Sequence, residues 1–153
     1  MPRASDKIAV TNRRARHEYH ILDVFECGLV LKGSEVKSIR DGRANLSDAF
    51  ARVERGEVWL HSMHVSPYPF SRDNPDPLRR RKLLLHRAEI VRLTTKAAEK
   101  GLTLVPLKIY FQDGFAKVEL AVGQGKRQWD KRQAMAERDA RRETDRAVKE
   151  RQR

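Results

Sequence analysis

Alternation of apolar and polar positions is the clearest pattern in the first 122 residues of the chain. It runs over two pairs of segments, each joined at a dipeptide that ends in glycine: 49–55 with 57–63 around Arg55-Gly56, and 102–112 with 115–122 around Asp113-Gly114. A period of two residues places every second side chain on one face of a strand, and a glycine suits the tight turn between strands. The pattern therefore predicts two β-hairpins, each with one buried face.

Two further stretches predict strands. Residues 8–10 form a short apolar run, and residues 19–31 are rich in β-branched and aromatic side chains, with Gly28 where a long strand could bend. Three stretches predict helices by a capping residue or a closing glycine: 13–16 after Asn12, 35–40 after Ser34, and 86–100 before Gly101. Because strands and helices do not alternate as in βαβ units, we expect a mainly β fold, a small closed antiparallel barrel with about three short helices.

The apolar pattern weakens in two places. Residues 66–78 contain four prolines, and we expect a loop of weak order there. From Gly123 to Arg153 the chain has 11 Lys plus Arg against 6 Asp plus Glu, and pairs four residues apart stabilise a lone helix by only about 0.2–0.5 kcal/mol each. We therefore predict a body over 1–122 and a basic tail over 123–153, loosened by Gly123 and Gly125 and disordered until a partner orders it.

Charge narrows the range of partners. The 153 residues include 33 Lys plus Arg and 21 Asp plus Glu, a net charge of +12 that attracts nucleic acid or an anionic membrane. No run of 18 apolar residues occurs, and the N-terminal residues lack the apolar core of a signal peptide, so we expect a cytoplasmic protein without a membrane partner. The single cysteine, Cys27, lies in an apolar run, which predicts a buried, unreactive thiol.

Residues suited to catalysis or metal binding are sparse. His17, Glu18 and His20 suggest acid/base chemistry, and His61 with His64 suggest a metal, but no third ligand stands at metal spacing and no glycine-rich phosphate loop occurs. We predict no catalytic residue, no metal and no cofactor. A small ribonuclease that uses His17, Glu18 and His20 stays an alternative.

Basic residues gather in the body as well as in the tail. Arg13, Arg14 and Arg16 stand beside the rings of His17 and Tyr19, a combination that suits phosphate contacts and base stacking on RNA. The predicted helix at 35–40 carries Lys37 and Arg40 on one face, and Arg79-Arg80-Arg81-Lys82 is a third cluster. Each cluster alone could be a solvated surface, but together they favour an RNA-binding protein. A general RNA chaperone is one alternative.

Five stretches, taken in order, resemble the SsrA-binding protein (small protein B) family of bacteria: 12–19, Phe25–Gly28, Gly33–Ser38, Arg79–Leu85 and Gly125–Arg132. The resemblance covers nearly the whole chain. It implies a barrel of the oligonucleotide-binding type and no enzyme activity. It also implies binding to the tRNA-like domain of transfer-messenger RNA, which such proteins deliver with elongation factor Tu to ribosomes stalled without a stop codon.

The resemblance assigns site residues too. Together with the cations named above, the RNA-binding set is Asn12, Arg13, Arg14, Arg16, His17, Tyr19, Glu26, Lys37, Arg40, Lys82 and Leu84. The tail motif, which in the family works in the decoding centre and enters the vacant messenger channel as a helix, matches Lys126, Arg127, Trp129, Asp130, Lys131 and Arg132. Trp129 stands where the family often has histidine, so it keeps a stacking face but cannot be protonated near neutral pH. We expect a monomer that meets elongation factor Tu only through the RNA.

Overall fold

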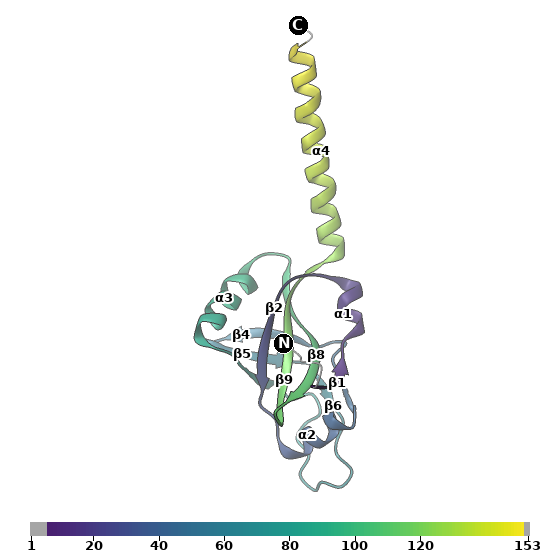
Figure 1. Ribbon diagram of the computed structural model, residues 1–153, viewed down its shortest axis with the longest axis vertical. Coiled ribbons are helices and arrows are strands. Elements are labelled where there is room, and N and C mark those ends of the chain that lie inside the picture. The colour runs from purple at the N-terminus through teal and green to yellow at the C-terminus, as the bar shows by residue number, and fades with distance from the viewer. Residues whose placement is uncertain (1–5, 152–153) are drawn as a thin grey trace.

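The structure, a computed structural model, describes residues 6–151 and their side chains except those of 127–131 and 149–151 (Figure 1). The fold is mainly β with several helices, as predicted. The strands are β1 (Lys7–Thr11), β2 (Tyr19–Leu29), β3 (Ala44–Asn45), β4 (Phe50–Glu54), β5 (Glu57–His61), β6 (His64–Val65), β7 (Arg81–Leu84), β8 (Leu102–Gln112) and β9 (Phe115–Gly125). The helices are α1 (Arg13–Glu18), α2 (Gly33–Arg40), α3 (Arg87–Ala98) and α4 (Lys126–Arg151).

The main sheet has seven strands in the order β1-β8-β4-β5-β7-β2-β9, and β9 also pairs with β8. The pairing between β8 and β9 closes the order, so the six strands from β8 to β9 form a ring in which each has two neighbours. All of these pairings are antiparallel. A closed order leaves few unpaired strand edges, which protects a small β protein from edge-to-edge association.

Alternation along the strands fills the interior of the ring. Phe25, Cys27 and Leu29 of β2 and Val118 and Leu120 of β9 lie in one buried cluster, while the residues between them face outward. Both predicted hairpins are confirmed as β4–β5 and β8–β9. Burial raises the pKa of Cys27 to about 12, so its thiol is protonated at neutral pH, as predicted.

The three predicted body helices are confirmed, with one difference in capping. Asn12 caps α1 as expected, because its side-chain oxygen accepts a hydrogen bond from the backbone N–H of Ala15. Ser34 is not the cap of α2, because the helix already begins at Gly33 and its N-cap residue is Lys32. Instead, the carboxylate of Glu35 accepts a hydrogen bond from the backbone N–H of Lys32 at 2.9 Å, which satisfies a free donor at the helix start.

The predicted loosening at Gly123 is wrong. Strand β9 continues to Gly125, and its last three residues pair with Tyr19–Ile21 of β2. A Cβ atom on Gly123 would lie 3.0 Å from Cβ of Tyr19, so glycine lets the Tyr19 side chain pack directly on the strand. Residues 123–125 resemble a linker because the β2 residues that pair with them, 19–21, lie far away in the chain.

Helix α4 leaves the body at the end of β9 and projects away from it (Figure 1). Near the start of α4, Arg132 Nη2 donates a hydrogen bond to the carbonyl oxygen of Lys100 at 3.3 Å. The side chains of α4 from 132 to 148 are exposed. The division of labour between body and tail, and the disorder of the tail in the free protein, stay predictions.

Candidate RNA interface

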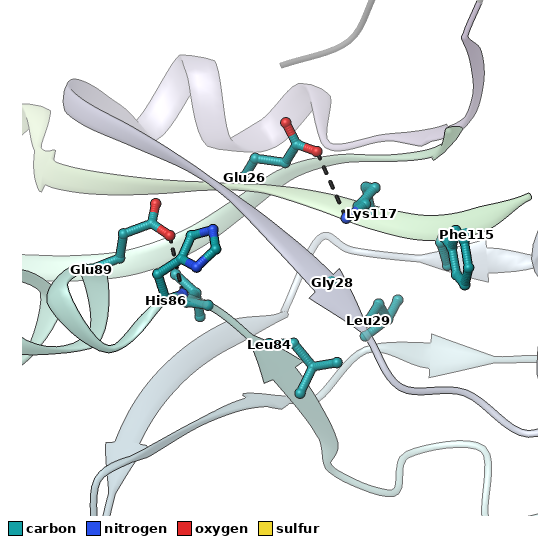
Figure 2. A pocket seen from close by; sticks show the side chains of 10 residues that line it. Glu26, Gly28, Leu29, Leu84, His86, Glu89, Phe115 and Lys117 are labelled. Atoms are coloured by element: carbon teal, nitrogen blue, oxygen red, sulfur yellow. Dashed lines mark hydrogen bonds and ion pairs between the residues drawn. The ribbon is translucent and has the colours of Figure 1, made fainter. Parts of the chain in front are cut away.

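A groove of about 600 Å³ opens on the outside of the ring where β2, β9 and the segment that joins β7 to α3 meet (Figure 2). Its lining includes two predicted site residues, Glu26 of β2 and Leu84 of β7. Gly28 lets the two strands approach closely, since a Cβ atom there would lie 3.2 Å from Cβ of Leu84. The fold thus brings together two predicted residues that are far apart in sequence.

The groove combines apolar surface with charge. Leu84 and Phe115 are exposed although both are large and apolar. Beside Phe115 on β9, Lys117 Nζ lies 3.9 Å from Glu26 Oε1, and on α3 Glu89 accepts a hydrogen bond from the backbone N–H of His86 at 3.1 Å (Figure 2). Carboxylate oxygens accept hydrogen bonds from base or ribose donors, an ammonium pairs with phosphate, and a flat ring stacks on a base. The groove therefore contains the kinds of group that RNA-binding sites use.

The groove is one end of a strip on the outer face of β9. Glu26 lies opposite Glu119, which in turn lies opposite Lys108 of β8, with Lys108 Nζ 3.7 Å from Glu119 Oε2. Burial, together with the nearby carboxylate of Glu26, raises the pKa of Tyr110 well above its usual value, so this phenol stays neutral beneath the strip. The two carboxylates are each matched by a lysine.

Helix α1 covers the other end of the strip. Ala15 is buried against Leu107 and Ala121, which fixes the helix on the outer face of β8 and β9. The side chains of Arg13, Arg16 and His17 are consequently exposed. Arg13 and Arg16 form no ion pair with any residue in the described part of the chain, so their charges are available to a polyanion.

Other predicted residues of this segment are already engaged. Arg14 Nε lies 2.7 Å from Glu18 Oε1, and its Nη1 lies 3.1 Å from Asp48 Oδ1. Asn12 is only 4% exposed, and its amide nitrogen donates hydrogen bonds to the carbonyl oxygens of Pro106 at 2.8 Å and Leu46 at 3.2 Å. Because its oxygen also caps α1, both donors and the oxygen of this side chain are used to hold that helix in place.

The cluster Arg79–Lys82 differs most from its sequence interpretation, because it is not a free basic surface. Arg81 is 0% exposed, and its guanidinium binds the Glu35 carboxylate at 2.7 Å and the carbonyl oxygen of Pro77 at 3.1 Å. Arg79 binds the same carboxylate. Arg80 and Lys82 pair with glutamates of the β4–β5 hairpin, with Arg80 Nη1 2.6 Å from Glu54 Oε2 and Lys82 Nζ 3.3 Å from Glu57 Oε1.

Glu35 is the centre of this buried network, a role that the sequence analysis did not predict. Burial opposes its ionisation, but hydrogen bonds from Arg79, from the Lys32 backbone and from Arg81 outweigh it and hold the pKa of Glu35 below its usual value. Sequence offers no signal for this arrangement, because the carboxylate and the two guanidinium groups come from different elements.

The remaining predicted residues lie elsewhere. Lys37 and Arg40 of α2 face aromatic rings, with Lys37 Nζ 5.5 Å from the Tyr68 ring centre and the Arg40 guanidinium 4.2 Å from that of Phe111. Lys126 begins α4, whereas the side chains of Arg127, Trp129, Asp130 and Lys131 lie outside the described residues. Lys108, Phe115 and Lys117 were not singled out from the sequence, although the period of two in 115–122 places Phe115 and Lys117 on the outward face.

Neither a metal site nor a membrane-spanning helix is found in the described part of the chain. His61 Nε2 lies 2.8 Å from Glu54 Oε1, and its ring stacks on Phe50 with centres 5.4 Å apart. Among the described residues no three histidine, cysteine, aspartate or glutamate side chains gather as a metal site would require, and no helix there is long and apolar enough to span a membrane.

Known proteins resemble this chain along nearly its whole length. A protein-family model described as SmpB protein matches residues 9–150. An SsrA-binding protein of Pelotomaculum thermopropionicum is 58% identical over 148 residues, 96% of this chain and 97% of the relative. One of Geobacillus thermodenitrificans is 56% identical over 153 residues, 99% of each chain. A solved structure described as "tmRNA-SmpB: a journey to the center of the bacterial ribosome" matches with a TM-score of 0.66 and 53% identity, over 76% of this chain and 82% of that one.

Proposed function

Because the chain belongs to the SmpB protein family, we propose that it binds transfer-messenger RNA (tmRNA) and carries it to stalled ribosomes for trans-translation. Its relatives are named for binding SsrA, and the similar solved structure joins tmRNA, SmpB and the bacterial ribosome. The observation that carries the proposal within this molecule is the strip on β9, with the exposed Arg13 and Arg16 of α1 at one end and the groove of Glu26 and Leu84 at the other.

We propose that the closed ring of strands is a barrel of the oligonucleotide-binding type. The closed antiparallel order and the RNA-suited outer face are what such barrels use to hold nucleic acid. On this surface Arg13 and Arg16 would contact phosphates, while Glu26 would accept hydrogen bonds from base or ribose groups. The protein would act without catalysis, as a monomer, and would meet elongation factor Tu through the RNA.

Glu26 gives the sharpest test of the groove. Glu26→Gln keeps the shape of the side chain but removes the charge that lets it accept strong hydrogen bonds, so affinity for a tmRNA transcript should fall by about tenfold. Glu99→Gln, which changes an exposed carboxylate outside the groove, is the matched control. Binding should survive an excess of unrelated RNA, and labelled RNA should stay intact. If unrelated RNA displaced tmRNA as effectively as unlabelled tmRNA does, the protein would be a general RNA chaperone. Cleavage of the labelled RNA would favour a ribonuclease.

The tail is proposed to test whether the messenger channel is empty. Ordering a segment on binding costs commonly about 2–5 kcal/mol, which phosphate contacts in a free channel would offset. Since β9 extends to Gly125, the informative truncation ends at Gly125 and leaves the sheet whole. This variant should keep tmRNA binding and lose tagging of stalled products. Loss of both activities together would contradict the division.

Trp129 provides a finer test of the tail. Trp129→Ala removes its stacking face and should reduce tagging, whereas Trp129→His restores the ring common in the family and should retain it. Tagging that is unchanged in the alanine variant would return this segment to the status of a linker.

A further inference from the structure

The loop between β6 and β7 carries two aromatic side chains at its tip. Phe70 is 86% exposed, more than any other large apolar side chain among the described residues. Its ring meets that of Tyr68 edge to face, with centres 5.5 Å apart and planes at 68°. The two rings together form a small exposed apolar patch, and a patch of this kind can mark a site of contact with another molecule.

The tip is held in shape by its own hydrogen bonds, contrary to the weak order expected from its prolines. The side chain of Asn74 accepts from the backbone N–H of Tyr68 at 2.9 Å and donates to the carbonyl oxygens of Tyr68 at 3.2 Å and Ser71 at 3.1 Å. The N–H of Ser71 also donates to the carbonyl oxygen of Tyr68. One asparagine thus closes the loop across six residues.

The base of the loop is fixed to the body. Pro77 accepts hydrogen bonds at its carbonyl oxygen from the buried Arg81 and from the N–H of Val65. At the other side, Ser38 Oγ of α2 donates to the carbonyl oxygen of Ser66 at 2.7 Å. A loop closed at its tip and bound at both ends is pre-organised, so little entropy is lost when it contacts a partner.

Charges beside the rings indicate which partner fits. Lys37 Nζ of α2 lies 5.5 Å from the centre of the Tyr68 ring, and Arg72, two residues after Phe70, is exposed. Of the nearby acidic residues, Asp76 accepts a hydrogen bond from the N–H of Leu78 within the loop, and Asp73 is exposed. Flat rings flanked by cations suit an unpaired nucleobase with its phosphate.

We propose that Tyr68 and Phe70, with Lys37 and Arg72, form a platform on which an unpaired base of tmRNA stacks, a contact separate from the groove. The proposal rests on the proposed function, since it adds a second contact with the same RNA. The loop lies beneath α2 at the end of the body opposite α4 (Figure 1). This is therefore the end of the body farthest from the tail that is proposed to enter the messenger channel.

The test compares Phe70→Ala and Phe70→Leu in binding to a full tmRNA transcript. Base stacking on an aromatic ring predicts a loss of roughly 5- to 150-fold for alanine, and a similar loss for leucine because it has no flat face. Val91→Ala, an exposed apolar position on α3 outside the groove, is the control and should bind as the wild type does. Thermal unfolding of both Phe70 variants should match the wild type because the side chain is exposed.

Affinity within twofold of the wild type for Phe70→Ala would overturn the platform, and so would full recovery by leucine, which would indicate an apolar protein contact. A photoreactive phenylalanine analogue at position 70 gives an independent readout. It should cross-link to tmRNA in the complete complex with ribosomes, and cross-linking only to protein would overturn the proposal. If the wild type itself did not bind the transcript, the proposed function would fail first, which separates the two outcomes.

Discussion

Two basic clusters look alike in the sequence and differ completely in the structure. On α1, Arg13 and Arg16 are exposed and form no ion pair with a described residue. In the run Arg79–Lys82, every cation is paired: two with Glu35 inside the body and two with glutamates on the β4–β5 hairpin. The charges of the first cluster are therefore available to a partner, whereas those of the second are neutralised by ion pairs that hold strands and a loop together.

The difference shows that the number of cations in a segment does not give the charge available for RNA. What matters is whether the fold supplies a carboxylate. Glu35 reaches Arg79 and Arg81 from α2, whereas the carboxylates that pair with an arginine of α1 in the described part of the chain, Glu18 and Asp48, both pair with Arg14. Four experiments test this contrast, from the largest expected effect to the smallest.

Removing the buried carboxylate should have the largest effect. Glu35→Gln leaves Arg81 buried without a counter-charge, and breaking such a pair costs roughly 3–5 kcal/mol of the free energy of unfolding. The measurement is urea unfolding. Glu54→Gln, which breaks a more exposed pair with Arg80, should cost about 0–1 kcal/mol. If the two variants lost the same stability, the buried cluster would be no more structural than the exposed one.

Acid should reveal the same network without a mutation. The pKa of Glu35 is lower in the folded than in the unfolded protein, so its contribution to stability is present above the ordinary value of 4.5 and is lost as the pH falls through the folded value. Urea unfolding from pH 7 down to pH values below 4.5 should show a steeper loss for the wild type than for Glu35→Gln. Parallel curves for the two proteins would rule out Glu35 as the source.

Releasing α1 should cost less but should affect both stability and RNA. Asn12→Ala removes the helix cap and two hydrogen bonds to the neighbouring segments, for a loss of about 2 kcal/mol in unfolding free energy. Asn12→Asp keeps the capping oxygen but places a second carboxylate oxygen against the two carbonyl oxygens in a buried place, so it should lose at least as much stability as alanine. RNA affinity should decline in the same order, because the helix carries the free arginines. An alanine variant as stable as the wild type would show that α1 is held by Ala15 alone.

Neutralising the free cluster should leave the fold intact and change only the salt dependence of RNA binding. For Arg13→Gln with Arg16→Gln, the slope of log affinity against log salt should fall by about 1.4–1.8, at roughly 0.7–0.9 for each phosphate contact. The matched pair Arg80→Gln with Lys82→Gln should change this slope less, because both cations already face carboxylates. Equal changes would mean that the paired cluster also reaches the RNA.

Much of the fold was predictable because it depends on local pattern. The period of two along β8 and β9, the glycine turns and the cap at Asn12 each specify an element from residues that are neighbours in sequence. The strand β7 was not predicted, since its first two residues are Arg81 and Lys82 and the signal of a buried strand is absent there. Only the pairing with Glu35 makes a buried arginine possible.

The candidate site was predictable to the same extent. The residues of α1, Glu26 and Leu84 were identified from composition and from the family resemblance, but the strip that joins them depends on the register of β9 between β2 and β8. Register comes from contacts between distant segments, so Lys108, Lys117 and Phe115 could not be placed beside Glu26 by sequence alone.

The unbroken course of β9 has a mechanical consequence. One strand carries Lys117 at the groove, passes beneath Tyr19 and continues straight into α4, with hydrogen-bonded neighbours on both sides for most of its length. A pull along α4 would therefore load two ladders of hydrogen bonds in shear, all at once, because these bonds lie across the strand direction. If α4 enters the messenger channel as proposed, tension on it would be transmitted along β9 to the proposed RNA interface.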